Sequence, residues 1–342
     1  MIDIERGFDM NIYDIAEKSG VSIATISRVL NGGKNVSKKT YKKVMDVIET
    51  EGYTPNVFAR GLGLNTMKTI GILVTDVSDV HYARIISLLS EYLRELDMDV
   101  LLCCTGSDVN NKKKELEILL EKRVDAIFLA GSAVQELEDN SHLIEAAGKV
   151  PVIMINGYID APGIINVFAG EEEATADCIR KLSACGICHP LYLYDRITYS
   201  GMRKMKGFQR GLAECRITET QESMLQVEKD LEAIDRAIEC RLAEGARFDA
   251  VLGSEDIIAI GALKALQKRG IDVPVIGYNN SVFAEISSPQ LTSIDNMLEP
   301  ICRTAVQFFH DVLDGKETAS KAEIACKLVE RESFDSSRQY KK

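Results

Sequence analysis

Two patterns of hydrophobic positions divide the chain. Between residues 12 and 51 apolar side chains recur every three or four positions, which predicts short amphipathic helices. From about residue 69 the apolar positions form short continuous runs, at 70–74, 100–104, 125–129, 152–155, 164–167, 191–194, 250–252 and 275–278. Such runs are typical of parallel strands that crossover helices cover on both faces. The sequence therefore predicts a small all-α head followed by two doubly wound parallel-sheet α/β subdomains.

The first two helices have the spacing of a helix-turn-helix. Ile12 and Ile15 give the first helix an apolar face, Gly20 tolerates the positive φ of a tight turn, and Ser22 is a suitable N-cap for the second helix, in which Ile26 faces inward. The outward face then carries Ile23, Ala24, Ser27 and Arg28. Such groups can contact base edges and phosphates in a major groove. An ordinary helical hairpin is equally compatible with this spacing alone.

Charge is distributed unevenly along the chain. The 342 residues carry a net charge of −11, whereas residues 11–62 hold eight Lys/Arg against five Asp/Glu. A third helix is expected from the cap Ser37 to Glu51, and lysines cluster near its start at positions 38, 39, 42 and 43. They suit a phosphate backbone, although a solvated polar face would look the same. Any affinity for DNA is therefore concentrated in the head.

Polar residues follow the predicted strands, where ligands of doubly wound sheets bind. They are Asp76, Thr105, Ser132, Asn156, Asp195, Ser254, Glu255, Asp256, Asn279 and Asn296. Taken singly, each is as well explained as the N-cap of the next helix. The set contains no paired nucleophile and base and no metal-ligand cluster, so neither an enzyme, a cofactor nor a metal site is predicted.

Nine cysteines lie mostly within apolar segments and are predicted to be reduced core residues of a cytoplasmic protein. Cys185, Cys188 and His189 match a haem-attachment or redox pattern. With no secretion signal ahead of it and a predicted strand behind it, this motif is better interpreted as a helix-to-strand turn. No apolar run is long enough to cross a membrane.

At residues 12–16, 20–22, 25–32 and 52–56, continuing to Ala59 and Leu62, the sequence resembles the lactose-repressor/galactose-repressor (LacI/GalR) family of bacterial transcription regulators. The resemblance implies that Ile23 and Ala24 read bases and that residues 56–62 form a hinge helix whose Leu62 wedges into the minor groove beside Ala59. Gly61 departs from the family pattern. The DNA-contacting residues implied are Tyr13, Ser22, Ile23, Ala24, Thr25, Ser27, Arg28, Asn31, Tyr53, Asn56, Ala59 and Leu62.

The resemblance continues through residues 249–263, 275–280 and 289–294 and implies an effector domain like that of periplasmic sugar-binding proteins. The expected effector site comprises Asp76, Ser132, Asn156, Ser200, Lys204, Glu255, Asp256, Asn279 and Asn296. Lys204 stands where the family usually has arginine, Asn279 where it often has aspartate, and Glu255 where asparagine is common. A plain sugar is therefore a weaker expectation than for the family at large.

These observations predict an extension at 1–10, a DNA-binding domain at 11–55, a hinge at 56–68 and an effector and dimerisation domain at 69–342. One subdomain is expected at 69–163 plus 295–320 and the other at 164–292 plus 321–335. The expected function is a homodimeric transcription regulator, by default a repressor, that binds a pseudo-palindromic double-stranded operator under the control of a carbohydrate-like small molecule. The alternatives are a solute-binding protein of the same fold and a regulator whose pocket no longer binds a ligand.

Overall fold

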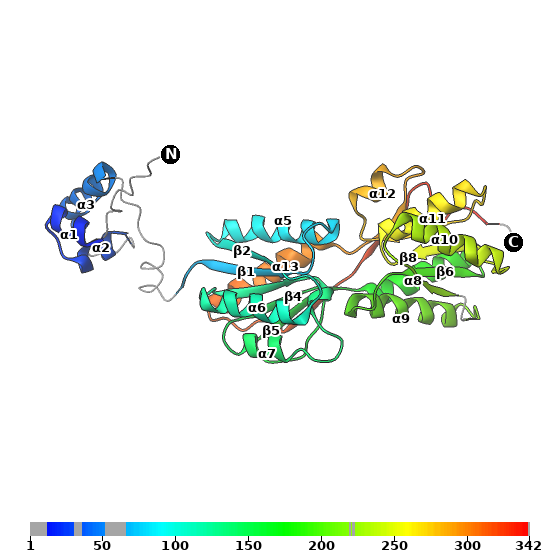
Figure 1. Ribbon diagram of the computed structural model, residues 1–342, viewed down its shortest axis with the longest axis horizontal. Helices are drawn as coiled ribbons and strands as arrows, with labels where there is room; N and C mark the ends of the chain where they lie inside the picture. Colours follow the sequence, from blue (N-terminus) through cyan, green and yellow to red (C-terminus); the bar gives the residue numbers. More distant parts are fainter. Residues whose placement is uncertain (1–11, 31–35, 52–65, 219, 221–222, 341–342) are drawn as a thin grey trace, which may run out of the picture. The chain divides into compact units, whose positions relative to one another are not determined.

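A computed structural model describes residues 12–30, 36–51, 66–218, 220 and 223–340, and the chain forms two compact units (Figure 1). One unit takes in the chain up to Thr69 together with residues 123–125, and the other holds the remainder. The predicted combination of a helical head and an α/β domain is confirmed. The hinge predicted at 56–68 lies largely outside the described residues.

Three helices form the head: α1 (Ile12–Ser19), α2 (Ile23–Leu30) and α3 (Lys38–Glu51). Their apolar faces meet in one small core, made of Ile15, Ile26, Val29, Val44 and Ile48. Each of these five side chains is at most 8% exposed. The three-to-four-residue spacing of apolar positions therefore marks the buried stripe of each helix.

The turn between α1 and α2 forms as its sequence predicts. Gly20 has a φ of +60°, a backbone conformation that glycine adopts without strain. Ser22 then caps α2, because its Oγ accepts a hydrogen bond from the backbone N–H of Thr25 at 3.3 Å. Ser37 caps α3 in the same way, accepting from the N–H of Thr40 at 3.1 Å.

Two six-stranded sheets form the cores of two subdomains in the larger unit. The first has the order β11-β5-β4-β3-β1-β2, with strands β1 (Thr69–Val74), β2 (Asp99–Cys104), β3 (Ala126–Ala130), β4 (Val152–Ile155), β5 (Ile164–Ala169) and β11 (Lys321–Ile324). The second has the order β12-β10-β9-β8-β6-β7, with strands β6 (Pro190–Tyr194), β7 (Met224–Gln226), β8 (Ala250–Gly253), β9 (Val275–Tyr278), β10 (Thr292–Asp295) and β12 (Lys327–Val329). In the second sheet β12 pairs antiparallel with β10, whereas β10, β9, β8, β6 and β7 pair in parallel.

Helices cover both sheets. The first subdomain contains α5 (Val80–Glu95), α6 (Val109–Glu121), the short η1 (Ser132–Val134), α7 (Ser141–Ala147) and α13 (Leu298–Leu313). The second contains α8 (Glu171–Ala184), α9 (Tyr199–Glu214), α10 (Leu231–Ala243), α11 (Asp256–Lys268) and α12 (Val282–Ile286). In the first, α13 packs against α5; in the second, α8 packs against α9 and α10 against α11. These helices bury both faces of each sheet, which explains the uninterrupted apolar runs of its strands.

The predicted subdomain boundaries are wrong at each crossing. The sequence places β5 at the start of the second subdomain, but the strand lies between β4 and β11, with Ile164 opposite Val152 and Val167 opposite Ala322. β11 also belongs to the first sheet, and β10 lies wholly within the second. The chain therefore crosses between sheets at Gly170, after β10, and between β11 and β12. An apolar run predicts a buried strand, but it carries no information about which sheet the strand joins.

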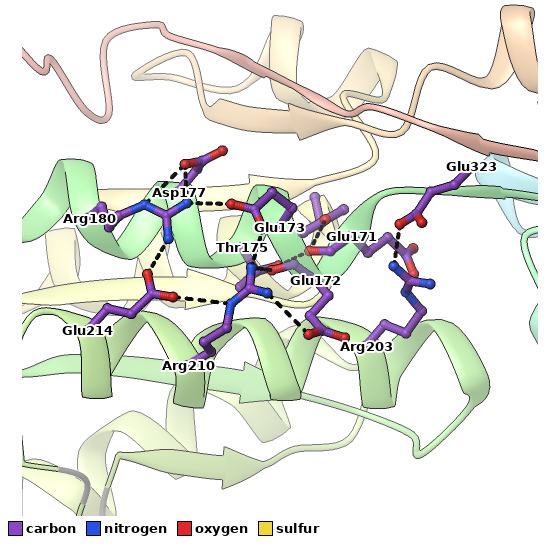
Figure 2. Close-up of polar contacts among 11 residues, drawn as sticks. Glu171, Glu172, Glu173, Thr175, Asp177, Arg180, Arg203, Arg210, Glu214 and Glu323 are labelled. Atoms are coloured by element: carbon purple, nitrogen blue, oxygen red, sulfur yellow. Dashed lines mark hydrogen bonds and ion pairs between the residues drawn. The ribbon is translucent and has the colours of Figure 1, made fainter.

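Helices α8 and α9 are in unusually close contact. A Cβ on Gly207 would lie 2.2 Å from the backbone oxygen of Glu172, so only glycine permits this approach. Phe208 beside it is fully buried and stacks on Tyr192. On the outer side Arg180 and Arg210 extend between the helices and bind carboxylates of both (Figure 2), namely Glu172, Glu173, Asp177 and Glu214. Exposed pairs of this kind are individually weak, so the close helix packing is the main contribution.

Candidate DNA-binding face and ligand cleft

Helix α2 has one buried and one exposed face. Ile26 and Val29 are 0% and 3% exposed, whereas Ile23 is 38% exposed and Ala24 and Arg28 are also exposed. The outer face therefore combines two apolar groups with a guanidinium. That combination can pack against thymine methyl groups and donate to guanine or phosphate oxygens in a major groove.

The other predicted DNA-contacting residues divide into two groups. On the described helices Tyr13 is 69% exposed, Ser22 is exposed, and Thr25 and Ser27 are half-buried. The hydroxyls of Ser22 and Thr25 are 2.9 Å apart and share a hydrogen bond at the start of α2. The others lie outside the described residues: Asn31, Tyr53, Asn56, Ala59 and Leu62. The four lysines near the start of α3 are all exposed.

A polar cavity of about 40 Å³ lies between the two subdomains of the larger unit. Six residues expected to bind an effector line it, namely Ser132, Asn156, Ser200, Lys204, Glu255 and Asn279. They come from both subdomains, at the ends of strands and the beginnings of helices, as the fold predicts. This cavity alone holds a few water molecules only, but a cavity of about 290 Å³ adjoins it, and Asp79, His81, Glu255 and Asn279 line both.

Glu171, at the start of α8, organises the floor of the cleft. Its carboxylate is 1% exposed and accepts hydrogen bonds from Asn156 Nδ2 at 3.1 Å and from Ser200 Oγ at 2.5 Å. The ammonium of Lys204 lies 3.8 Å away. Asn156 follows β4 and Ser200 lies on α9, so this one carboxylate links the two subdomains. Three donors around a buried carboxylate compensate for its loss of water.

Lys204 is only 5% exposed and is held on several sides. Its Nζ donates to the backbone oxygen of Ser254 at 3.0 Å and lies 4.1 Å from the centre of the Tyr278 ring. With Glu171 nearby, the ammonium has a carbonyl, a carboxylate and an aromatic face as partners. Lys204 therefore stabilises the floor of the cleft.

At the mouth of the cleft a second lysine joins the subdomains. Lys229, between β7 and α10, donates from Nζ to Asp79 Oδ2 at 2.7 Å and also forms an ion pair with Glu255. Asp79 belongs to the first subdomain, where its other oxygen caps α5 by accepting from the N–H of His81 at 2.9 Å. Lys229 therefore spans the cleft.

Two further contacts complete the lining. Ser132 donates from Oγ to Thr198 Oγ1 at 3.1 Å, which is another link between the subdomains. His81 borders the cavity from α5, and burial, with the nearby charge of Lys204, lowers its pKa to about 4. Its Nδ1 is buried and has no hydrogen-bond partner within the described parts of the chain. The imidazole is therefore neutral at physiological pH.

Three of the expected effector-binding residues do not line the smaller cavity, although Asp76 and Asp256 line the larger one that adjoins it. Asp76 is exposed and accepts from the N–H and Oγ of Ser78. Asp256 is 2% exposed and accepts from Ser281 and Ser293, and burial raises its pKa despite these bonds. Asn296 is fully buried and donates from Nδ2 to Asn279 at 2.9 Å. Asp256 and Asn296 therefore fix loops around the cleft.

Family models match both parts of the chain. One, described as periplasmic binding proteins and sugar binding domain of the LacI family, covers residues 67–332, and the other, described as bacterial regulatory proteins of the lacI family, covers residues 11–56. The chain belongs to the LacI family.

Relatives agree with the LacI-family assignment over almost the full length. A protein named HTH-type transcriptional regulator from Lachnoclostridium phytofermentans is 42% identical over 330 residues, which cover 95% of this chain and 99% of the relative. Catabolite control protein A of Priestia megaterium is 29% identical, over 92% of this chain and 95% of the relative. The chain is therefore a DNA-binding transcriptional regulator and not an enzyme.

Solved structures support the LacI-family fold. The lac repressor dimer bound to operator and the anti-inducer ONPF matches with a TM-score of 0.84 and 23% identity, over 95% of this chain and 98% of that one. A complex of the transcriptional regulator CelR with cellobiose matches with a TM-score of 0.70 and 22% identity, over 95% and 100% of the two chains. At these identities the likeness concerns the fold alone.

Several residues of this LacI-family cleft were not predicted from the sequence. Glu171 begins a run of three glutamates, and nothing in the run distinguishes this buried residue from the half-buried and exposed ones that follow it. Lys229 lies between two acidic residues in a polar loop, where a solvated side chain is the default expectation. Asp79 and His81 follow β1 closely enough that a wider search at the strand end could have included them.

The cysteine motif forms a turn, as predicted. Cys185 ends α8, Gly186 has a φ of +93°, and the backbone N–H groups of Cys188 and His189 both donate to Asp249 at 2.7 Å before β6 begins. All nine cysteines are free, and four of them are buried. Cys104 and Cys240 are exposed, which corrects their predicted place in the core. Within the described ranges no cluster of three or more metal-binding side chains occurs, and no helix there is long and apolar enough to span a bilayer.

Proposed function

We propose that this LacI-family regulator is a cytoplasmic homodimeric repressor whose affinity for a pseudo-palindromic operator is set by a small molecule, a sugar or related metabolite, held in the cleft. The composition of the cleft supports this proposal. Both subdomains contribute polar side chains to it, so a ligand there contacts both and can favour one relative placement over another. The cellobiose bound to CelR is a precedent in a protein of the same fold.

The proposed DNA interface rests on the exposed face of α2. Two heads of modest positive charge, related by a dimer axis, would bind two half-sites, and phosphate contacts would add to each. Ile23 and Ala24 are proposed to read bases. Leu62 is proposed, from the family resemblance, to wedge into the minor groove at the operator centre, where an easily unstacked pyrimidine–purine step would favour it.

Selection of operators from a randomised pool tests the DNA assignment. The wild-type protein is expected to select an inverted repeat, and exchange of Ile23 and Ala24 should change the preferred half-site. An unchanged preference contradicts their role as readers. Leu62→Ala should weaken operator binding by about tenfold or more, because the inserted side chain maintains the kink that brings more of the DNA into contact with the protein. Equal affinities for the two proteins would exclude the wedge.

Thermal unfolding in the presence of sugars, sugar phosphates and nucleosides tests the effector assignment. A ligand that binds the folded protein raises Tm in a saturable manner, and the same compound should change operator affinity. A second candidate is a regulator whose cleft no longer takes an effector, which is favoured by the mutual pairing of Lys229, Asp79 and Glu255. Operator binding without a Tm response to any compound would support it.

A further inference from the structure

Lys229 places a protonated amine inside the mouth of the cleft. Its ammonium is 2.7 Å from Asp79 Oδ2 of the first subdomain and also contacts the carboxylate of Glu255 in the second. The side chain of Lys229 is 29% exposed, whereas those of Asp79 and Glu255 are 11% and 23% exposed. The structure thus shows two partly buried carboxylates that hold a primary ammonium between them.

One of the two carboxylates, that of Asp79, is positioned by the fold independently of the lysine. Asp79 is held as the N-cap of α5 through the N–H groups of His81 and Tyr82, at 2.9 and 3.4 Å. Glu255 directly precedes α11. The side chain of Glu255 makes no capping hydrogen bond there, so removal of Lys229 would leave Asp79 held as the cap of α5 and both carboxylates without their shared cation. The other cation at this edge, Arg196, is already paired with Asp195 at 3.2 Å.

The electrostatics fit a cation between these groups. Burial acts to raise the pKa of Asp79, but the hydrogen bond and charge of Lys229 outweigh it, and the pKa lies below its usual value. Burial lowers the pKa of Lys229, but the neighbouring carboxylates reverse the effect and raise it. For Glu255, burial prevails and the pKa is raised. Glu255 is therefore the carboxylate that is less well compensated.

Two polar groups of the same cavity are available to a ligand. Ser254 is 5% exposed, and its Oγ has no hydrogen-bond partner among the residues that the structure describes. Nδ1 of His81, on the opposite subdomain, likewise has no hydrogen-bond partner among the described residues. Both residues line the cavity. A ligand with a hydroxyl group and a cationic nitrogen could form hydrogen bonds with these groups. Water molecules in the cavity would leave Lys229 in its place at the mouth of the cleft.

We propose that Asp79 and Glu255 form an ammonium site at the mouth of the cleft, which Lys229 fills in this structure and a ligand with a protonated primary amine would fill in its place. The inference rests on the proposed function, since it specifies the class of effector. A hydroxylated primary amine, such as an amino sugar, is the chemical class that fits. Its ammonium would displace that of Lys229, and its hydroxyls would reach Ser254 and His81.

Chemical rescue tests the site. Lys229→Ala removes the atoms from Cγ to Nζ, and n-propylammonium supplies the same three carbons and ammonium. In Lys229→Ala this ion should raise Tm saturably, by roughly 2–4 °C at ten times its Kd. Potassium chloride at equal ionic strength and 1-propanol, the neutral analogue, serve as controls. The double variant Lys229→Ala/Asp79→Asn keeps the cap of α5 but loses one charge, and it should respond several-fold more weakly.

The proposal is overturned if n-propylammonium has no effect beyond the two controls, or if it affects both variants equally. Lys229→Gln, treated in the same way, provides a second background if Lys229→Ala does not fold. Operator binding by the wild-type protein is measured alongside. If the proposed function is wrong, the wild-type protein shows no sequence-specific operator binding. If only the ammonium site is wrong, operator binding is intact and the rescue by n-propylammonium is absent.

Discussion

Glu171 and Lys204 show how a buried charge can be tolerated in this cleft. Neither side chain is more than 6% exposed, and both have partners that their own chain provides. The carboxylate has two neutral donors besides the lysine, and the lysine has the Ser254 carbonyl and the Tyr278 ring. Removal of one charge leaves the other buried and less compensated, which is more destabilising than loss of the pair.

A double-mutant cycle should reveal this coupling. Glu171→Gln and Lys204→Met should each lower the free energy of unfolding by about 3 kcal/mol, because each leaves a buried charge behind. The double variant should cost less than the sum by more than about 1 kcal/mol. Urea unfolding of the four proteins measures the coupling. Strict additivity would mean that the two charges, 3.8 Å apart, do not stabilise one another.

His81 predicts a dependence of stability on pH. Its pKa in the folded protein is lowered to about 4 from 6.5, mainly by burial. Between these values the unfolded chain binds a proton that the folded chain does not, so stability falls as pH decreases from about 6.5 to about 4. The loss over this window is roughly 3 kcal/mol at most.

Thermal unfolding of wild type and His81→Gln between pH 4 and pH 7 checks this expectation. The variant should lose less stability on acidification, and His189→Gln, which alters an exposed histidine, serves as the matched control. Parallel curves for wild type and His81→Gln would show that His81 is not protonated preferentially in the unfolded chain.

At the scale of elements, the contact of α8 with α9 depends on one missing side chain. Gly207→Ala would place a Cβ 2.2 Å from the Glu172 oxygen, and a helix backbone cannot yield locally. Overpacking of this kind costs about 1–3 kcal/mol, despite the better helix propensity of alanine. Gly148→Ala is the control, because the nearest atom to its Cβ would be 3.4 Å away and its φ of −69° suits alanine. Equal stability of the two variants in urea would contradict a steric role for Gly207.

The sequence predicts elements well where one helix face or one strand is buried. The stripe through Ile26 and Val29 and the cap at Ser22 follow from local spacing and hydrogen bonding, and both are found. Short or partly exposed strands such as β7 and β12 escape the same reasoning, because their burial depends on neighbours. The sequence predicts β5 as a strand but places it in the wrong sheet, since pairing partners are a property of the tertiary fold.

The candidate cleft was predictable in outline only. The rule that ligands bind beyond the carboxyl ends of parallel strands placed Ser132, Asn156 and Asn279 correctly along its lining. The ion pair of Lys229 with Asp79 depends on how the second subdomain meets the first, across 150 positions of sequence, and that of Glu171 with Lys204 depends on the packing of α8 against α9. No local pattern contains that information, so these residues could be found only in the assembled structure.

For the whole molecule, each unit has its own hydrophobic core. The core of the head contains five buried residues, with Ile26 at 0% exposure near its centre, whereas the larger unit has extensive cores around each sheet. A small core supports only marginal stability.

Calorimetry of the full chain without DNA is therefore expected to show the head unfolding at a lower temperature than the larger unit. Ile26→Ala, which removes about 2–5 kcal/mol of core stability, should lower only the first transition. Glu171→Gln should lower only the second, and a shift of both transitions by either variant would show that the two units unfold as one cooperative structure.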